Sequence, residues 1–451
     1  MTGASPVPGR DDWPPLAWGA DESPMRFSVG LGTTTNRMFA SEPFRPVLVL
    51  GPQRSYKTTG VAIPTLLEWN GPALVTSVRR DVLDGTFNWR QRQGKVYIYD
   101  PSTGLDGTPF ASERYGWDIL AECTSWDDSV RTARALTEAG RLHGVLDAAF
   151  WYSLATQSLA PYLFAARHSE RTMDDVVRWT KMQEEFEVRS ILQDAGNELA
   201  IMTAEDGWQR EDRVRSSVYA TLSSVLRVFD YEQTGALAGP YIDIDEFLQS
   251  ENDTIYVCGA PDEQDEYRPL FTGLVRTVVR RLYSKNIAEL DNLAARASVS
   301  SPSAGHRQLA SMLLLLDEAG NITALENLDG LATTAAGTRL QIVSIFHDVS
   351  QMEHIYGQYG ARSILNNHSA LLVLPGSRDR ATLEYIEMLL RGERVANALE
   401  SNWIGPRPIR SMQKGEALLV YENLRPIVLS LRSTFNNARL RDRSVRAEEC
   451  K

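Results

Sequence analysis

The stretch that decides the fold is "LVLGPQRSYKTTG", residues 48–60. It matches the phosphate-binding pattern G-x-x-x-x-G-K-[ST] at its first glycine, Gly51, and at its last two positions, Lys57 and Thr58. The second glycine of the pattern is absent, and Tyr56 stands in its place. The stretch therefore predicts a phosphate site with one unusual position.

The flanking residues supply the context that such a loop requires. The apolar run "PVLVL" at 46–50 is typical of a buried strand, and helical spacing of apolar residues begins after Thr58. Backbone N–H groups at the start of that helix would face phosphate oxygens. Lys57 would neutralise the β- and γ-phosphates, and the Thr58 hydroxyl would ligate Mg²⁺. The predicted nucleotide-binding residues are Gly51, Pro52, Gln53, Arg54, Ser55, Tyr56, Lys57, Thr58 and Thr59.

A second run, "LLLLDE" at 313–318, places two acids at the end of an apolar strand. Packing alone does not explain them, because acidic side chains are rarely buried without a partner. In phosphate-loop ATPases the aspartate at this point holds the Mg²⁺ shell, which assigns Asp317 to the metal together with Thr58. The next residue, Glu318, can polarise the attacking water as a general base. With Lys57 as the second catalytic residue, these groups predict a site for ATP and Mg²⁺.

Composition limits the class of protein. The 451-residue chain has 43% hydrophobic and 23% charged residues, which is ordinary for a folded protein of two or three domains. Its formal net charge of −11 excludes a general basic coat for nucleic acid, so any DNA contact is expected to be local. The three cysteines are far apart in the sequence, which argues against a zinc site built from them.

The sequence contains no recognisable membrane or export segment. No run approaches the ~18 apolar residues of a membrane-spanning helix. The first 24 residues lack the positive charge and apolar run of a signal peptide. We expect a cytoplasmic protein, peripheral at the inner face of the cell membrane if a partner recruits it there.

Predicted strands alternate with helices on either side of a long helical block. This alternation indicates an α/β fold with a mostly parallel sheet and helices on both faces. Residues 416–431 have the pattern of an edge hairpin. The predicted strands are 46–50, 73–78, 95–100, 254–260, 312–321, 341–348 and 370–376. The predicted divisions are an extended arm at 1–44, an α/β domain at 45–124 and 240–432, an all-α insertion at 125–239, and a flexible tail at 433–451.

The order and the amino-acid sequences of these motifs resemble the type IV secretion coupling proteins of the TraG/TraD type, in their actinobacterial form. These proteins belong to the FtsK-like class of hexameric pumping ATPases. The resemblance covers most of residues 46–390. Its main stretches are residues 47–83, "VYIYDP" at 96–101, "RVRSSVYATLSSVL" at 213–226, residues 313–337, "LQIVSIFHDVSQMEHIYG" at 340–357 and "ILNNHSALLVLPGSRDRATLEYI" at 364–386.

The resemblance implies a RecA-like P-loop NTPase domain with an inserted all-helical domain. It also implies a hexameric ring that hydrolyses ATP to move DNA, or to deliver a relaxase or secreted protein, to separate components of a membrane channel. The family places a sensing glutamine after the strand that follows the paired acids, and here that position is His347. Gln351 matches a second family glutamine one helical turn later.

Tyr56 is the main departure from the family pattern. The second loop glycine adopts a backbone conformation that side chains resist, and a tyrosine held there would cost roughly 1–3 kcal/mol. Either the loop holds this strain and binds ATP, or it relaxes and binds nucleotide weakly. Two alternatives to a DNA motor therefore stay open: a non-hydrolysing docking platform, and an ATPase that recruits protein substrates.

Ring ATPases also use an arginine that reaches a neighbouring subunit's nucleotide. Three candidates lie near family motifs: Arg339, Arg215 and Arg378. A separate basic stretch, "RTVVRRLYSK" at 276–285, is compatible with a DNA backbone contact or with a helix end that complements its own dipole.

Overall fold

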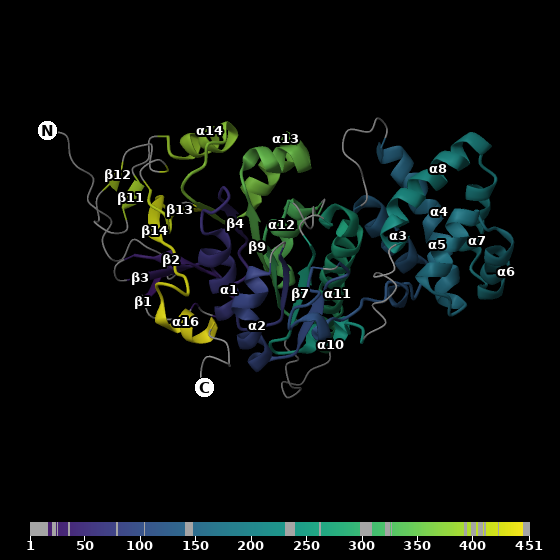
Figure 1. The fold of residues 1–451 in the computed structure, drawn as a ribbon, viewed down its shortest axis with the longest axis horizontal. Helices are drawn as coiled ribbons and strands as arrows, with labels where there is room; N and C mark the ends of the chain where they lie inside the picture. Colours follow the sequence, from purple (N-terminus) through teal and green to yellow (C-terminus); the bar gives the residue numbers. More distant parts are fainter. Residues whose placement is uncertain are drawn as a thin grey trace.

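The computed structural model describes residues 17–19, 24, 26–34, 37–77, 80–102, 104–139, 148–230, 240–260, 263–297, 309–320, 325, 327–391, 395–397, 403–404, 409, 412–422 and 424–444. A large mixed sheet with helices on both faces lies beside a bundle of helices (Figure 1). The predicted α/β class is confirmed. Within the described ranges, no helix is both long enough and apolar enough to cross a membrane.

The parallel part of the sheet is built from buried strands. Every residue of these strands is buried, because helices cover both faces, and their sequences are accordingly near-continuous apolar runs. In spatial order they are β10 (Ala370–Val373), β4 (Val47–Leu50), β9 (Leu340–Phe346), β8 (Met312–Leu316), β5 (Ala73–Ser77), β7 (Thr254–Cys258) and β6 (Val96–Tyr99).

Strand β4 illustrates how the two faces are covered. Val47 and Val49 belong to a hydrophobic cluster formed with the helices after the phosphate loop, whereas Leu48 and Leu50 belong to a second cluster on the opposite face. This alternation follows from the two-residue period of a strand. The first face carries η1 (Thr58–Ala62), α1 (Ile63–Glu68) and α2 (Asp81–Gln93), and the second carries α11 (Gln264–Ala297), α12 (Leu328–Thr338) and α13 (Val349–Asn367).

Beyond β10 the sheet continues with antiparallel strands. The hairpin of β13 (Glu416–Tyr421) and β14 (Ile427–Ser430) pairs with β10 on one side and with β2 (Gly30–Thr33) on the other. The predicted hairpin is confirmed, but its expected place at the edge of the sheet was wrong, because strands from the N-terminal segment extend the sheet past it. The outer strands are β3 (Arg37–Ala40) and β1 (Ala17–Gly19), while β11 (Val395–Asn397) pairs with β14 and with β12 (Trp403–Ile404).

The two chain ends also differ from the expected arm and tail. Phe27, Val29 and Leu31 are buried in the cluster on the α1 face, since alternate apolar side chains of this segment point toward it. Near the C-terminus, α16 (Ala438–Ser444) packs Leu440 against Ile63 and Leu67 of α1. The described parts of both ends therefore belong to the α/β body. Residues 1–16 and 445–451 lie outside the described residues.

A helical bundle is inserted between β6 and β7 (Figure 1). Helix α4 is its centre and packs against α3, α5, α6, α7 and α8. Its helices span most of the predicted 125–239 block, and 231–239 lie outside the described residues. They are α3 (Trp126–Ala139), α4 (Ala148–His168), α5 (Met173–Met182), α6 (Phe186–Ala195), α7 (Glu198–Trp208), α8 (Asp212–Val225) and η4 (Leu226–Asp230).

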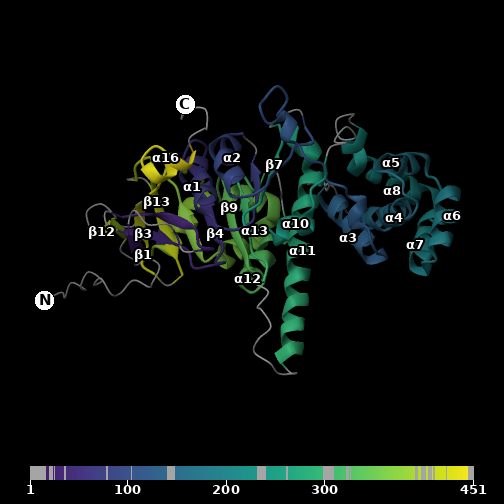
Figure 2. The ribbon, with the colours of Figure 1, turned by 90° about the horizontal axis from the view of Figure 1, so that it is seen from below.

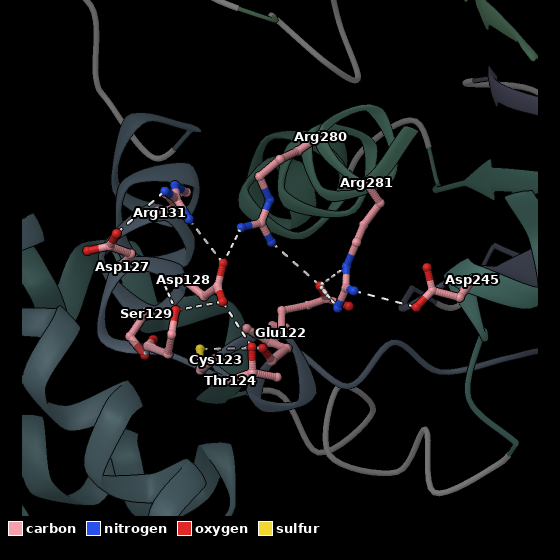
Figure 3. A network of polar contacts seen from close by, with 12 residues as sticks. Glu122, Cys123, Thr124, Asp127, Asp128, Ser129, Arg131, Asp245, Arg280 and Arg281 are labelled. Atoms are coloured by element: carbon pink, nitrogen blue, oxygen red, sulfur yellow. Dashed lines mark hydrogen bonds and ion pairs between the residues drawn. The ribbon is translucent and has the colours of Figure 1, made fainter. Parts of the chain in front are cut away.

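Ion pairs join the bundle to α11, the 34-residue helix whose C-terminal part projects from the body (Figure 2). Glu122, at the end of η3 (Leu120–Glu122), is only 6% exposed. Its Oε2 accepts hydrogen bonds from Nε and Nη2 of Arg281 at 3.2 and 3.1 Å and lies 3.6 Å from Arg280 Nη2. Arg280 Nη1 also donates to Asp128 of α3 at 2.7 Å (Figure 3). Two arginines of the basic 276–285 stretch are therefore engaged by acids of the same chain.

We predict that Glu122→Gln will lower the free energy of unfolding by about 2 kcal/mol, because it removes the buried carboxylate that Arg280 and Arg281 share and leaves them only the more exposed Asp128 and Asp245. Chemical denaturation followed by circular dichroism measures this change. Asp127→Asn is the matched control, since Asp127 belongs to the same network but is 75% exposed at its side chain, 3.7 Å from Arg131. The control should change stability by less than about 0.5 kcal/mol. Equal effects of the two variants would contradict the prediction.

His368, just before β10, predicts a pH dependence of stability. Its Nδ1–H donates to Ile364 O at 2.8 Å, and burial lowers the pKa of this imidazole to about 4. In the unfolded chain the pKa is about 6.5, so above that pH both states are neutral. As pH falls from about 6.5 to 4, the unfolded state binds the proton first, and this residue reduces stability by up to about 1.4 kcal/mol per pH unit. Denaturation of wild type and His368→Asn over this range should show a shallower pH slope in the variant, and parallel slopes would contradict the assignment.

Candidate nucleotide-binding site

Three neighbouring strands bring the predicted site residues to one edge of the sheet. β9 lies between β4 and β8 and runs parallel to both, so the carboxyl ends of all three open on the same side. The phosphate loop follows β4, Asp317 follows β8, and His347 follows β9. These residues are far apart in the sequence, and the parallel pairing makes them neighbours.

Lys57 lies inside the loop rather than in solvent, with 6% of its surface exposed. Its Nζ donates to the backbone oxygens of Gly51 and Pro52 at 2.7 and 3.0 Å. The loop folds closely enough that a Cβ on Gly51 would lie 2.6 Å from Ser55 Oγ, which explains why glycine stands there. The loop carbonyls therefore hold the ammonium group at the centre of the turn.

Tyr56 adopts the backbone conformation expected of the missing glycine. Its φ is 73°, and Arg54 has a φ of 61°, so two side-chain-bearing residues of this loop are in the left-handed region. The Tyr56 ring packs against the cluster on the α1 face, and Lys414 Nζ lies 5.8 Å from the ring centroid. These contacts offset part of the strain at Tyr56, whereas the Arg54 side chain is exposed.

Asp317 is the buried acid of the site, at 3% exposed. Burial, and then the charge of Glu318, raise the pKa of Asp317 to about 6. Its Oδ2 accepts hydrogen bonds from Thr58 Oγ1 at 3.2 Å and from Ser77 Oγ at 3.5 Å. Ser77, the last residue of β5, was missed in the sequence, although a polar side chain at that strand end was the available signal.

These residues fit a magnesium ion. Asp317 Oδ1 is buried and accepts no hydrogen bond from any described residue, which is costly for a carboxylate unless a cation neutralises it. A nearby hydroxyl and one carboxylate are typical of a site that Mg²⁺ completes with waters and substrate phosphates. Such a site needs no cluster of three acids or histidines, and the described residues contain none.

His347 and Gln351 link β9 to the loop and to the acids. Nδ1 of His347 lies 2.8 Å from Lys57 Nζ. Burial, and then the Lys57 charge, lower the pKa of His347, so the neutral ring can accept a hydrogen bond from the ammonium. Gln351 Oε1 accepts a hydrogen bond from the His347 backbone N–H at 2.9 Å. The Gln351 side chain also packs closely over Gly320, where an added Cβ would lie 2.8 Å from Gln351 Nε2. Glu318, with a φ of 58°, follows Asp317 at the same edge.

Comparison with known proteins identifies the family. Residues 20–396 match the family model described as "Type IV secretory system Conjugative DNA transfer". The chain belongs to this family. Among its relatives, the conjugal transfer protein TraG of Escherichia coli is 25% identical over 366 residues, which are 76% of this chain and 54% of TraG. VirD4 of Rhizobium radiobacter is 24% identical over 413 residues, 84% of this chain and 53% of VirD4. The chain thus spans about half the length of these relatives.

Solved structures of this conjugative DNA transfer class share the fold. The bacterial conjugative coupling protein TrwBdeltaN70 superposes with a TM-score of 0.63 and 19% identity, covering 86% of this chain and 85% of that one. TrwB in complex with ADP and Mg²⁺ has a TM-score of 0.62 and 19% identity, with 86% of each chain covered. At this identity the likeness shows the fold alone: a RecA-like α/β fold with an inserted helical bundle.

The three arginine-finger candidates lie in three different surroundings. Arg339 precedes β9, at the edge of the sheet opposite the loop, and its guanidinium lies 5.0 Å from the Phe44 ring centroid. Arg215, on α8, donates to Trp208 O at 2.9 Å. Arg378 lines a groove beside the phosphate loop. The structure therefore brings only Arg378 of the three to the site of its own chain.

The backbone strain at Arg54 can be tested by substitution with glycine. Arg54→Gly should raise the free energy of unfolding by about 1 kcal/mol, since glycine adopts the positive φ without steric cost and the exposed side chain contributes little packing. Gln53→Gly is the matched control, because Gln53 is exposed in the same loop without a positive φ and should lose about 0.5–1 kcal/mol. Thermal denaturation of both variants measures the difference. Destabilisation by Arg54→Gly would contradict the assigned backbone conformation.

Proposed function

We propose that this protein binds and hydrolyses ATP with Mg²⁺ to drive transfer of DNA in a conjugative or type IV secretion system. The observation that carries the proposal is the convergence of Lys57, Thr58, Asp317 and Glu318 at one edge of the sheet, with an unpartnered buried oxygen on Asp317. Ammonium, hydroxyl and two carboxylates form the set that a metal–phosphate site requires. The family to which the chain belongs supports the link to DNA transfer.

Each residue has a role that follows from its position. Lys57, now held by loop carbonyls and His347, would turn its donors toward β- and γ-phosphate oxygens. Thr58 and Asp317 would hold Mg²⁺, which supplies positive charge against the phosphates. Glu318 would accept the proton of the attacking water. His347 and Gln351 would report occupancy of the site to α13, because their hydrogen bonds join the loop to that helix.

The partners belong to the same proposal. The family description and the conjugal transfer protein TraG support DNA as cargo. A relaxase or secreted protein as further cargo, and separate membrane-channel components as neighbours, are carried over from the resemblance seen in the sequence. A homo-hexameric ring fits the FtsK-like class, with hydrolysis between subunits. The chain would act in the cytoplasm, at the inner face of the cell membrane. With a net charge of −11, DNA contacts would be confined to a restricted surface such as a ring lumen.

A second candidate, a non-hydrolysing docking platform, rests on two local features. Tyr56 has a φ of 73° in a loop that normally holds glycine there, and a histidine replaces the sensing glutamine. Both features would weaken nucleotide binding if the loop relaxed in solution. We favour the ATPase because Thr58 is hydrogen-bonded to Asp317 and Lys57 lies inside the loop despite the unusual tyrosine.

Two substitutions separate these functions. Lys57→Ala should abolish binding of a fluorescent ATP analogue, since it removes the charge at the centre of the loop. Glu318→Gln should keep that binding within a few-fold but lower DNA-stimulated ATP hydrolysis about 100-fold or more, because only the general base is lost. Glu387→Gln, an exposed acid on α14 (Arg380–Leu389), is the control and should change neither readout.

Three results would favour other functions. Wild type that binds no nucleotide, with partner binding unchanged by Lys57→Ala, would replace the motor with a docking platform. Binding that is restored only in Tyr56→Gly would place the cause in the strained tyrosine. Hydrolysis that Glu318→Gln reduces but DNA does not stimulate would favour a protein-recruiting ATPase.

A further inference from the structure

A groove lies where the helical insertion meets the α/β body. Its volume is about 370 Å³, and its walls come from α3, from α11 and from residues at and just before the start of α12. We call it the junction groove. Its apolar lining residues are Ala135, Val279, Tyr283, Ile287, Leu325 and Leu331. Ile287 is 58% exposed, so this apolar surface opens to solvent.

The apolar lining continues along α11. Tyr283, Ile287 and Leu290 are spaced by four and three residues, which places them on one face of the helix. Leu290 is 46% exposed, and the C-terminal part of α11 projects from the body (Figure 2). An apolar stripe that runs from a groove into solvent is typical of a surface that receives a helix from another molecule.

Arginines form the charged part of the lining. They are Arg131, Arg134, Arg276 and Arg280. No acid is among the described residues that line the junction groove. The groove therefore presents positive charge around its apolar surface, on a chain whose formal net charge is −11.

The acids near these arginines do not saturate them. Asp128 and Glu138 each pair with two of the four arginines, and the exposed Asp127 lies 3.7 Å from Arg131 (Figure 3). The side chains of Arg131 and Arg134 are 55% and 65% exposed. Because a guanidinium has five N–H donors, both arginines can also pair with a carboxylate of another molecule.

Helix α7 of the bundle presents a face with the complementary chemistry. Glu198, Leu199, Met202 and Asp206 fall within an arc of about 100°, since each residue of a helix turns by about 100°. Leu199 and Met202 are 62% and 67% exposed, and Glu198 is exposed as well. Asp206 pairs with Arg210 at 2.9 Å but keeps 71% of its side chain exposed. Two exposed apolar side chains thus lie between two acids, which suits an apolar groove lined by arginine.

We propose that the junction groove binds α7 of a second copy of this chain. Leu199 and Met202 enter the apolar part of the groove, and Glu198 and Asp206 pair with the arginines that line it. Charge complementarity favours this occupant, because the acids of α7 meet a lining whose charged residues are all cations. For the closed ring the inference rests on the proposed function, and it names the two surfaces through which neighbouring copies meet.

The groove cannot be filled by α7 of its own chain. Helix α4 packs against both α3 and α7 and separates them. In both views α3 lies next to α11, whereas α7 lies on the side of the bundle that faces away from the sheet (Figure 1, Figure 2). Each copy therefore offers one α7 and one groove to two different neighbours. Such a heterologous contact repeats from copy to copy and closes into a ring where the rotation permits.

Sedimentation velocity of the full chain, without nucleotide, measures this contact. Met202→Arg sets a cation against the arginines of the groove, and Ile287→Glu sets an acid against the acids of α7. Each should weaken self-association at least tenfold, because the apolar anchor is lost and like charges meet. Met182→Arg and Phe435→Glu are matched controls, because both residues are exposed outside the two surfaces, and each should change association less than twofold.

Circular dichroism checks that the variants fold. The substituted side chains are exposed, so thermal denaturation should stay close to that of wild type. Met202→Gln and Ile287→Gln are a second pair that introduces no charge. They should weaken association in the same direction through loss of the apolar contact alone.

An equal mixture of the two charged variants tests whether the surfaces pair with each other. The Met202→Arg copy keeps its groove, and the Ile287→Glu copy keeps its α7. The mixture should form dimers with the wild-type affinity and stop there, because the remaining α7 and the remaining groove are both disabled. A mixture of folded variants that stays monomeric would overturn the inference.

Two further results would also overturn it. One is a wild type that stays monomeric up to about 100 μM. The other is association of both variants with the wild-type affinity, in which case copies meet through other surfaces and the proposed ATPase stands. Lys57→Ala should associate as wild type does, so loss of the nucleotide site does not mimic loss of the contact. If wild type binds no nucleotide while the mixture forms dimers, the proposed function fails and the contact between copies remains.

Discussion

The parallel pairing of β4, β9 and β8 is the constraint on which the rest of the site depends. Leu50 lies opposite Phe346, and Leu316 lies opposite Ser344, so the segments that follow these strands start within a few residues of the same edge. Parallel strands require crossover connections, and these connections are the helices that bury both faces. The buried faces explain the apolar sequences of the strands, and their common direction explains why lysine, acid and histidine meet.

The edge of the sheet concentrates polar groups that would be unfavourable elsewhere. Asp317 is almost fully buried with one oxygen unpartnered, and Lys57 is buried among loop carbonyls. Neither arrangement contributes to stability as well as an apolar residue would. Left-handed backbone at Arg54, Tyr56 and Glu318 adds strain at the same place. A buried carboxylate oxygen without a hydrogen bond from a described residue, and strain gathered at the same edge, are the physical marks of a site selected for ligand chemistry rather than for packing.

The helical insertion is attached to the α/β body both covalently and electrostatically. It leaves the sheet after β6 and returns before β7, two strands that are direct neighbours. Glu122 and Asp128 then receive Arg280 and Arg281 from the helix that follows β7. Arg280 and Arg281 of the basic 276–285 stretch thus belong to the contact between the helical insertion and the α/β domain.

Much of the site could be predicted because its chemistry is encoded in short motifs. Lys57 and Thr58 were identifiable from a local pattern, and Asp317 and Glu318 from two acids at the end of an apolar run. For Tyr56 the sequence left a strained and a relaxed loop open, and the structure has the strained, left-handed backbone. The strands and the helical block were visible through their periodicity, because periodicity depends only on which face of an element is buried.

The tertiary structure decided what depends on contacts between distant segments. Residues 416–431 have the pattern of an edge hairpin, and only the pairing of β2 with β14 places them inside the sheet. The burial of Phe27 and Leu31 depends on the same pairing. The sequence alone does not distinguish the three candidate arginines. The fold places Arg339 against the aromatic ring of Phe44, Arg215 in the helical bundle and Arg378 in the groove beside the loop. Motif chemistry is local and can be read from one segment, whereas strand order and the surroundings of an exposed cation are set by the whole chain.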